Sequence, residues 1–260
     1  NLLAGPGIST NLADFGAQVI KVEHPKEGDP MRNWGEKKNG ISLAWKSYSR
    51  GKRLLAVDMH QSAGQEIIKK LAAQSDVMLE NYRPGRLEEW GLGYDQLSAM
   101  NPKLILVRIT GWGQTGPYKD RPGFGTLAEA FSGFAHITGQ VDGPPTLPPF
   151  GLSDSITSLT GTYAVMMALY DRDIHNQPGQ MIDLCIYESL FSILGPQVTE
   201  YDQLGIIAKR VGNRSPRGVP RNAYKTSDGR WVALSANAPN IAARLFRAIG
   251  REDMNTDPRY

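Results

Sequence analysis

The chain has 260 residues, enough to bury a substantial core in one large domain or two. Apolar residues make up 40% and charged residues 21%, and the net charge of +3 tolerates an anionic small ligand but gives no reason to expect a nucleic acid partner. The single cysteine, Cys185, excludes an internal disulfide and favours a reducing compartment, and no apolar run is long enough to span a membrane.

Short β-branched or apolar runs alternate with helical patterns through the first two hundred residues. Strands are predicted at 17–23, 53–59, 76–81 and 103–110. A helix is predicted at 62–74, where apolar residues recur on one face, and shorter helices follow Pro84 and fall near 94–100. This order of strand, helix and strand with short connections predicts a parallel α/β sheet.

Glycine and proline then interrupt the chain at 111–125, which is typical of a loop that lines a site at the end of a sheet. Helices are expected at about 126–134 and 154–172, and 180–194 starts as a strand and becomes a helix. Two strands at 223–227 and 230–236 are joined by the hairpin signal Asp-Gly, and a helix at 240–250 follows. We predict a large domain at 1–211, a linker at 212–221 and the start of a small domain at 222–260.

The two ends of the sequence indicate a piece of a longer protein. It begins without Met and stops directly after a helical pattern, so we expect the fold to be incomplete at both ends. Any targeting peptide would lie outside this sequence. We expect a cytoplasmic location by default, and mitochondrial and peroxisomal locations stay open because the start of the protein is missing from this sequence.

Three familiar site patterns are absent from the sequence. The segment "AGPGIST" has Thr10 where a dinucleotide fingerprint needs its third glycine, and Glu23 follows too soon to be the ribose-binding acid. There is no nucleophile elbow of the form G-x-S-x-G. The histidines are scattered, without an i, i+4 pair or a cysteine cluster, so no metal site is predicted; they are His24, His60, His136 and His175.

One carboxylate stands out in "PPFGLSDSITSLTGTYAVMMALYDRD", where Asp154 opens a long helical pattern of small and apolar residues. An Asp in that position can cap the helix by accepting hydrogen bonds from free backbone N–H groups. It can also act as a nucleophile, because the positive end of a helix favours the ionised form and carboxylates can carry covalent intermediates. The residues alone leave both interpretations open.

Three long segments in the right order resemble the class III CoA-transferases, the CaiB/BaiF family. They are "LAGPGISTNLADFGAQVIKVEHPKEGDPMRNWG", "SDVMLENYRPGRLEEWGLGYDQLSAMNPKLILVRITGWGQTGP" and "GLSDSITSLTGTYAVMMALYDRDIHNQPGQMIDLCIYESL". The resemblance implies an α/β fold with a Rossmann-like large domain and a smaller α+β domain, in an interlocked homodimer. It also implies that Asp154 is the catalytic nucleophile.

The resemblance implies that the enzyme moves CoA from an acyl-CoA donor to a carboxylic acid. Asp154 would form a mixed anhydride with the donor acyl group and then an aspartyl-CoA thioester. Coenzyme A is a substrate in this chemistry, and no permanently bound cofactor is expected. The residues that match CoA-lining positions of the family are Leu3, Ala4, His24, Val57, His60, Asn81, Tyr82 and Arg83.

Phosphate pairing differs from the family pattern, since His24 stands where some relatives have Arg and His60 where some have Lys. Arg32, Arg53 or Arg83 could replace those cations. On the acceptor side, Arg217 and Arg221 flank Gly218 in "SPRGVPRN", where formyl-type members have a glycine-rich lid. Guanidinium groups pair with carboxylates, so this loop favours a dicarboxylic acceptor.

Two positions of the sequence distinguish between activities of the same fold. Racemases use a His where this chain has Phe124, and Phe cannot exchange protons, so racemisation of a 2-methylacyl-CoA is the disfavoured alternative. Glu129 falls where transferases often have Gln, and we expect it to orient the substrate or Asp154. A thioesterase and a non-catalytic acyl-CoA-binding protein are the remaining alternatives. Cys185 is expected to be buried, and His136 to be structural.

Overall fold

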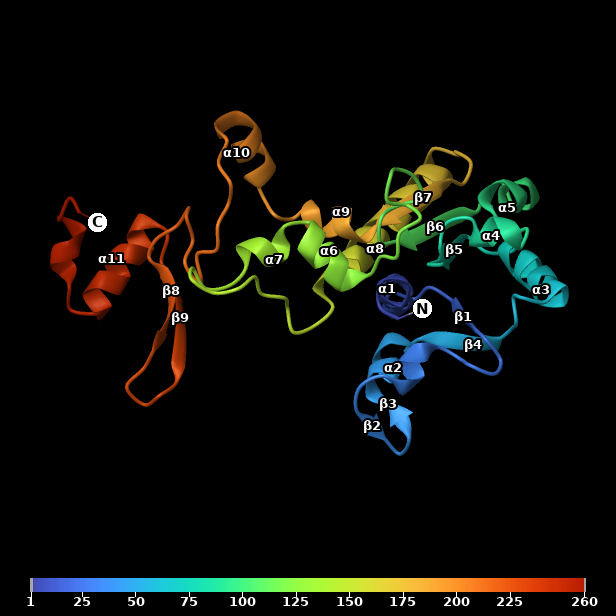
Figure 1. Cartoon of the computed structure of the whole chain (residues 1–260), viewed down its shortest axis with the longest axis horizontal. Coiled ribbons are helices and arrows are strands. Elements are labelled where there is room, and N and C mark those ends of the chain that lie inside the picture. The colour runs from blue at the N-terminus through green and yellow to red at the C-terminus, as the bar shows by residue number, and fades with distance from the viewer. Residues whose placement is uncertain (1, 260) are drawn as a thin grey trace. The chain divides into compact units, whose positions relative to one another are not determined.

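The computed structural model describes residues 2–259, which form two compact units (Figure 1). Of these residues, 2–134 and 148–195 form the first unit, and 135–147 and 196–259 form the second. The linker expected at 212–221 lies inside the second unit. These units reflect contacts within this chain alone. The predicted boundary between a large domain at 1–211 and a small domain from 222 therefore stays a prediction.

The first unit contains two parallel sheets. β1 (Val19–Glu23) pairs with β4 (Lys52–Ala56), and β5 (Val77–Glu80), β6 (Ile105–Thr110) and β7 (Met181–Cys185) form a sheet in that order. The prediction of parallel strands is confirmed. The strands do not form one continuous ladder, however, and β4 ends at Ala56, so that the residues after it form a turn rather than the end of a strand.

The helices of the first unit follow most of the predicted ranges. They are α1 (Ala4–Asp14), α2 (Leu43–Tyr48), α3 (Ser62–Ala72), α4 (Arg86–Glu89), α5 (Tyr94–Met100), α6 (Gly125–Phe131), α8 (Leu152–Ile174) and α9 (Ile186–Phe191). A short 3-10 helix (Pro30–Asn33), β2 (Lys37–Lys38), β3 (Ile41–Ser42) and α2 occupy a segment for which the sequence predicted no element. These elements are too short for hydrophobic periodicity to reveal them.

β6 is the central strand of its sheet and is buried on both faces. Ile105, Val107 and Ile109 pack into one apolar cluster, while Leu104 and Leu106 pack into another. The first cluster joins β6 to α1, α6 and α8, and the second joins it to α3, α4 and α5. Burial on both faces is typical of parallel sheets covered by helices, and it explains the continuous apolar run of this segment.

Helices α1 and α8 pack closely through two glycines. A Cβ atom on Gly7 would lie 2.1 Å from Ser158 Oγ, and one on Gly161 would lie 2.3 Å from Ile8 Cδ1. Ser158 Oγ in turn donates a hydrogen bond of 2.9 Å to the carbonyl of Ala4, which is the first residue of α1. This close approach brings the first turns of α1 and α8 together.

The second unit contains α10 (Gln197–Leu204), an antiparallel hairpin of β8 (Arg221–Lys225) and β9 (Trp231–Ser235), α11 (Pro239–Ala248), a 3-10 helix (Glu252–Asn255) and most of α7 (Phe134–Ile137). The predicted hairpin is confirmed, and Gly229 adopts a φ of 83° in its turn. β8 begins at Arg221, two residues earlier than predicted. Within residues 2–259, no helix combines the length and apolar character that crossing a bilayer requires.

Candidate active site

Asp154 lies in the first turn of the 23-residue helix α8. The N-cap of that helix is Gly151, and no side chain caps it through the N-cap position. The interpretation of Asp154 as the N-cap residue is therefore wrong. Its carboxylate remains close to the positive end of the helix, where a negative charge is favoured.

Glu129 from α6 supplies the capping interaction instead. Its side chain is buried, and its Oε1 accepts hydrogen bonds of 3.3 Å from both the backbone N–H and the hydroxyl of Ser153. Ser153 is fully buried. A carboxylate that comes from another helix thus satisfies a free N–H group in the first turn of α8.

The environment of Asp154 disfavours its charged form. Burial and then the nearby negative charge of Glu129 raise its pKa from 3.8 to about 6, although hydrogen bonds from the backbone N–H groups of Ala4 and Asp154 oppose them. The carboxyl group is mostly ionised at neutral pH, yet it is more basic than an exposed Asp. A basic, partly desolvated carboxylate is suited to attack on an activated carbonyl.

Small residues surround the carboxylate. A Cβ atom on Gly125 would lie 2.3 Å from Asp154 Oδ2, and one on Gly151 would lie 2.6 Å from Leu3 Cδ1. The structure thus brings the predicted Leu3, Ala4 and Glu129 together with Asp154. Phe124 precedes Gly125 and is the N-cap residue of α6, with 57% of its surface exposed.

The loop that leads to Gly125 closes on itself. A Cβ atom on Gly111 would lie 2.5 Å from the Cα of Gly123, and Trp112 Nε1 donates a hydrogen bond of 3.0 Å to the carbonyl of Pro122. The Trp112 ring also packs edge-on against Phe131 of α6. These contacts fix the entry of the chain into α6, and therefore the position of Gly125 beside Asp154.

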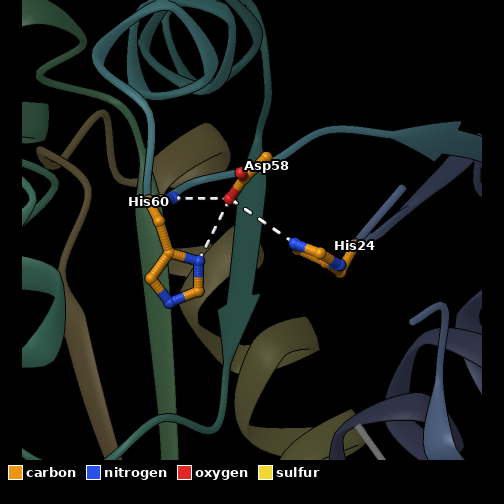
Figure 2. Close-up of side chains that lie close together, drawn as sticks. All are labelled: His24, Asp58 and His60. Carbon is orange, nitrogen blue, oxygen red and sulfur yellow. Dashed lines mark hydrogen bonds and ion pairs between the residues drawn. The ribbon is translucent and has the colours of Figure 1, made fainter. Parts of the chain in front are cut away.

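A second cluster lies where β1 and β4 end. Figure 2 shows the imidazoles of His24 and His60 turned toward one oxygen of Asp58. His60 Nδ1 lies 3.1 Å and His24 Nε2 lies 3.7 Å from Asp58 Oδ1. The backbone N–H of Val57 donates a hydrogen bond of 2.9 Å to the carbonyl of Glu23, which holds the two strand ends together.

Aromatic contacts extend this cluster to the end of β5. The His60 ring packs edge-on against Trp90, with ring centres 5.3 Å apart, and Trp90 packs against Tyr82 in the same way. Tyr82 and Asn81 directly follow β5, so these predicted CoA-site residues all lie beyond the carboxyl ends of parallel strands. In open α/β sheets ligands bind at such ends.

A buried ion pair supports the segment that follows β5. Arg108 of β6 contacts Glu80 at 2.7 Å and Glu88 at 2.6 Å. The other carboxylate oxygen of Glu80 accepts a hydrogen bond of 2.7 Å from the backbone N–H of Tyr82. The ion pair of Arg108 with Glu80 thus holds the backbone at Tyr82 in place.

The arginines proposed as phosphate partners differ in availability. Arg32 is engaged, because its Nε contacts Glu23 Oε2 at 2.7 Å and its guanidinium lies 4.0 Å from the centre of the Trp45 ring. Arg53 of β4 and Arg83 after β5 are exposed. Exposure favours the latter two as cations for an anionic ligand.

The residues predicted to meet the acceptor belong to the second unit. Arg217 contacts Glu200 Oε1 at 2.5 Å, and Gly218 lies against Asn237. Arg221 opens β8 and lines a hollow with Asn213 and Ser235. Their role toward the acceptor stays a prediction.

Sequence reasoning missed four residues of these clusters, namely Asp58, Trp90, Gly125 and Ser153. Asp58 could have been found from its place two residues before His60, just after a strand. Nothing in the sequence indicated Gly125 or Ser153, because their roles depend on contacts with α8 and α6. His136 is exposed in α7 and its carbonyl accepts a hydrogen bond from Arg210, and Cys185 is buried at the end of β7 as predicted.

Comparison with known proteins identifies the family. Residues 1–260 match the family described as CoA-transferase family III. This chain belongs to CoA-transferase family III. A solved CAIB/BAIF family protein from Brucella suis superposes with a TM-score of 0.87 at 33% identity, covering 100% of this chain and 69% of that one. That similarity confirms the α/β fold.

Among curated proteins that this chain resembles, a succinyl-CoA–D-citramalate CoA-transferase from Chloroflexus aurantiacus is 44% identical over 99% of this chain and 64% of its own length. A succinyl-CoA:glutarate CoA-transferase from Mus musculus is 40% identical over 100% of this chain and 59% of its own length. The chain therefore spans less than two thirds of these relatives.

Proposed function

We propose that this protein transfers CoA from succinyl-CoA, or a similar acyl-CoA, to a carboxylic acid through covalent intermediates on Asp154. The observation that carries the proposal is the partly buried Asp154 carboxylate in the first turn of α8, with its pKa raised to about 6. The choice of donor is supported by the names of similar proteins, which are succinyl-CoA transferases.

The proposed reaction proceeds in four steps. A carboxylate oxygen of Asp154 attacks the thioester carbonyl of the donor. The C–S bond breaks, CoA departs as a thiolate, and the acyl group remains on Asp154 as a mixed anhydride. The thiolate then attacks the Asp154 carbonyl and releases the donor acid as a carboxylate. The acceptor carboxylate attacks this aspartyl thioester and expels the thiolate again. Finally the thiolate attacks the acceptor carbonyl, which gives the new thioester and restores Asp154.

The surroundings of Asp154 support this chemistry in two ways. The positive end of α8 stabilises the Asp154 carboxylate, which is the leaving group of the last step. The Asp154 side chain is half-buried, and the chain approaches it closely at Gly125 and Gly151, which limits the contact of the carboxylate with water. Water would hydrolyse the anhydride and lose the activation of the acyl group.

CoA would lie along the carboxyl ends of the strands of the first unit. The half-buried Tyr82, which packs on the buried Trp90, offers aromatic surface there, and Arg53 and Arg83 are exposed cations. Arg221, and Arg217 on exchanging its ion pair with Glu200, are proposed to pair with the carboxylate of the acceptor, which favours dicarboxylic acids. Phe124 cannot exchange a proton at the α-carbon, so a transferase is preferred to a racemase.

Trapping of the acyl enzyme tests the proposal. The protein is mixed with succinyl-CoA and quenched with hydroxylamine, and the peptide that contains Asp154 is analysed by mass spectrometry. We expect a hydroxamate on Asp154 in the wild type and in the control Asp173→Ala, which removes an exposed carboxylate near the other end of α8. Asp154→Ala should show no hydroxamate. A hydroxamate at another residue, or none with any acyl-CoA, would refute the mechanism.

A further inference from the structure

The cluster of His24, Asp58 and His60 brings together three side chains that can each coordinate a metal ion. One ligand atom from each lies within 4.8 Å of the others. Two imidazole nitrogens and one carboxylate oxygen are the ligands of many zinc sites. We propose that these three residues bind a zinc ion, which joins the ends of β1 and β4.

The distances in the cluster suit a tetrahedral ion after small rotations of the side chains. Zinc bonds of 2.0–2.1 Å place neighbouring tetrahedral ligands about 3.3 Å apart. His60 Nδ1 lies 3.1 Å from Asp58 Oδ1, and His24 Nε2 lies 3.7 Å from the same oxygen. The two histidine rings stand nearly perpendicular, with centres 6.2 Å apart, so that both can aim a nitrogen at one point (Figure 2).

The ligands are held before any ion arrives. Asp58 Oδ1 accepts a hydrogen bond of 2.9 Å from the backbone N–H of His60, which fixes the carboxylate. The His60 ring rests on Trp90, and His24 is tied to its turn by a hydrogen bond of 2.9 Å from the N–H of Gly28 to its carbonyl. Orientation of the ligands by such partners increases the affinity of a metal site.

The site is also open to solvent. The His60 side chain is 68% exposed, whereas those of His24 and Asp58 are 27% and 29% exposed. An ion can therefore enter past His60, and water can complete its coordination. An open position of this kind is common where zinc has three protein ligands.

One contact opposes the ion. The backbone N–H of Glu27 lies 3.2 Å from His24 Nδ1 and donates to it, so Nε2 carries the proton of the neutral ring. Coordination through Nε2 moves that proton to Nδ1 and loses the hydrogen bond from Glu27. Because this bond is long and exposed, its loss is the smaller effect.

Zinc titration tests the inference independently of CoA. The protein is stripped with a chelator and desalted, and ZnCl₂ binding is measured by calorimetry. We expect one ion per chain, with a visible spectrum typical of tetrahedral coordination when Co²⁺ replaces Zn²⁺. His24→Ala and His60→Ala should each weaken binding at least about tenfold. Zinc should raise the Tm of the wild type and not that of His60→Ala.

The matched control is His175→Ala. His175, the C-cap residue of α8, has its Nδ1 2.9 Å from Asp171 Oδ1, and this exposed pair offers only two ligands, so the variant should bind zinc as the wild type does. Because the His60 ring is exposed, His60→Gln serves as a second variant that keeps the fold, verified by circular dichroism. Unchanged affinity in the His24 and His60 variants, or no saturable binding of one ion, would overturn the inference.

Discussion

Asp154 occupies a position that destabilises its ionised form. Because its folded pKa of about 6 lies above the ordinary 3.8, the folded state binds the proton more tightly than the unfolded state does. The loss of folding free energy caused by the ionised Asp154 is absent below pH 3.8, grows between pH 4 and 6, and reaches its full value above pH 6. Function and stability are therefore opposed at this residue.

Asp154→Asn should separate these two effects. It should lower kcat at least about 1,000-fold, because the nucleophile is lost. The free energy of unfolding should rise by roughly 3 kcal/mol at pH 7–8, and the gain should vanish below pH 4. Activity assays and urea unfolding at several pH values measure both effects.

A control of opposite sign is available in Asp29, which is buried beside Lys21. Burial raises the pKa of Asp29, but hydrogen bonds from Lys21 and the N–H of Met31 outweigh it, and the pKa is lowered overall. Asp29→Asn should therefore destabilise the protein at pH 7. Stabilisation by Asp29→Asn, or destabilisation by Asp154→Asn, would contradict this account of the two charges.

Glu129→Gln should change the pH dependence of activity. The amide oxygen of Gln can still accept hydrogen bonds from Ser153, but the negative charge that raises the pKa of Asp154 is removed. The acid limb of the kcat/KM profile, set by protonation of Asp154, should move to lower pH. Ser153→Ala is the control, since it removes a hydroxyl and no charge. A limb that moves in the control and not in Glu129→Gln would be evidence against the assignment.

Arg217 offers a test of acceptor recognition. Arg217→Ala and Arg221→Ala should each raise the KM of a dicarboxylic acceptor about tenfold or more, because a bidentate pair with the carboxylate is lost. The KM of succinyl-CoA should change less. Arg230→Ala, which removes an exposed Arg from the hairpin turn, is the control. Unchanged acceptor KM in the first two variants would eliminate them as acceptor ligands.

The role of a single residue was predictable where it depends on neighbours in the sequence, and it was missed where it depends on contacts with distant segments. Asp154 and Glu129 could be picked out from motifs, and burial of Cys185 from its strand pattern. The N-cap interpretation of Asp154 failed because the capping oxygen comes from Glu129, 24 residues before the Ser153 N–H that it accepts from. The meeting of His24 with Asp58 depends on the pairing of β1 with β4, which periodicity does not determine.

At the scale of elements, the approach of α1 to α8 positions the first turns of both helices. Gly161→Ala should destabilise the protein by about 1–2 kcal/mol, because the clash with Ile8 outweighs the helix propensity of Ala. Gly5→Ala is a matched control in α1, where a Cβ would lie 3.7 Å from Ile109 Cδ1 in ordinary contact. That variant should be neutral or more stable by up to about 1 kcal/mol. Urea unfolding decides between them, and equal effects would show that the glycine of α8 is not required for packing.

Elements with strong periodicity or apolar runs were predictable, and short elements were not. The helix α3 and the strand β6 lie close to their predicted ranges because their patterns reflect burial. α2, β2 and β3 are instead held by contacts such as the hydrogen bond from Ser42 Oγ to the carbonyl of Trp34. Such contacts leave no periodic trace in the sequence.

At the scale of the whole molecule, we propose a homodimer. Exposed apolar side chains follow one another along α8; they are Leu159, Tyr163, Met166, Met167, Tyr170 and Ile174. A long apolar stripe on a surface helix is typical of a protein interface. Sedimentation equilibrium should give twice the mass of the chain, and Met167→Glu should shift the equilibrium toward monomer. Lys69→Glu on α3 is the control, and a monomeric wild type would refute the proposal.

Gly111 contacts Gly123, so the segment between them is a loop whose two ends lie side by side. This loop is the excursion of the chain between β6 and α6. Trp112 and Tyr118 of this segment pack against Phe131 of α6, so an insertion that leaves α6 undisturbed must keep these two rings in place. Residues 115–117 are exposed, so a graft confined to them should change the excursion while Gly125 keeps its place beside Asp154.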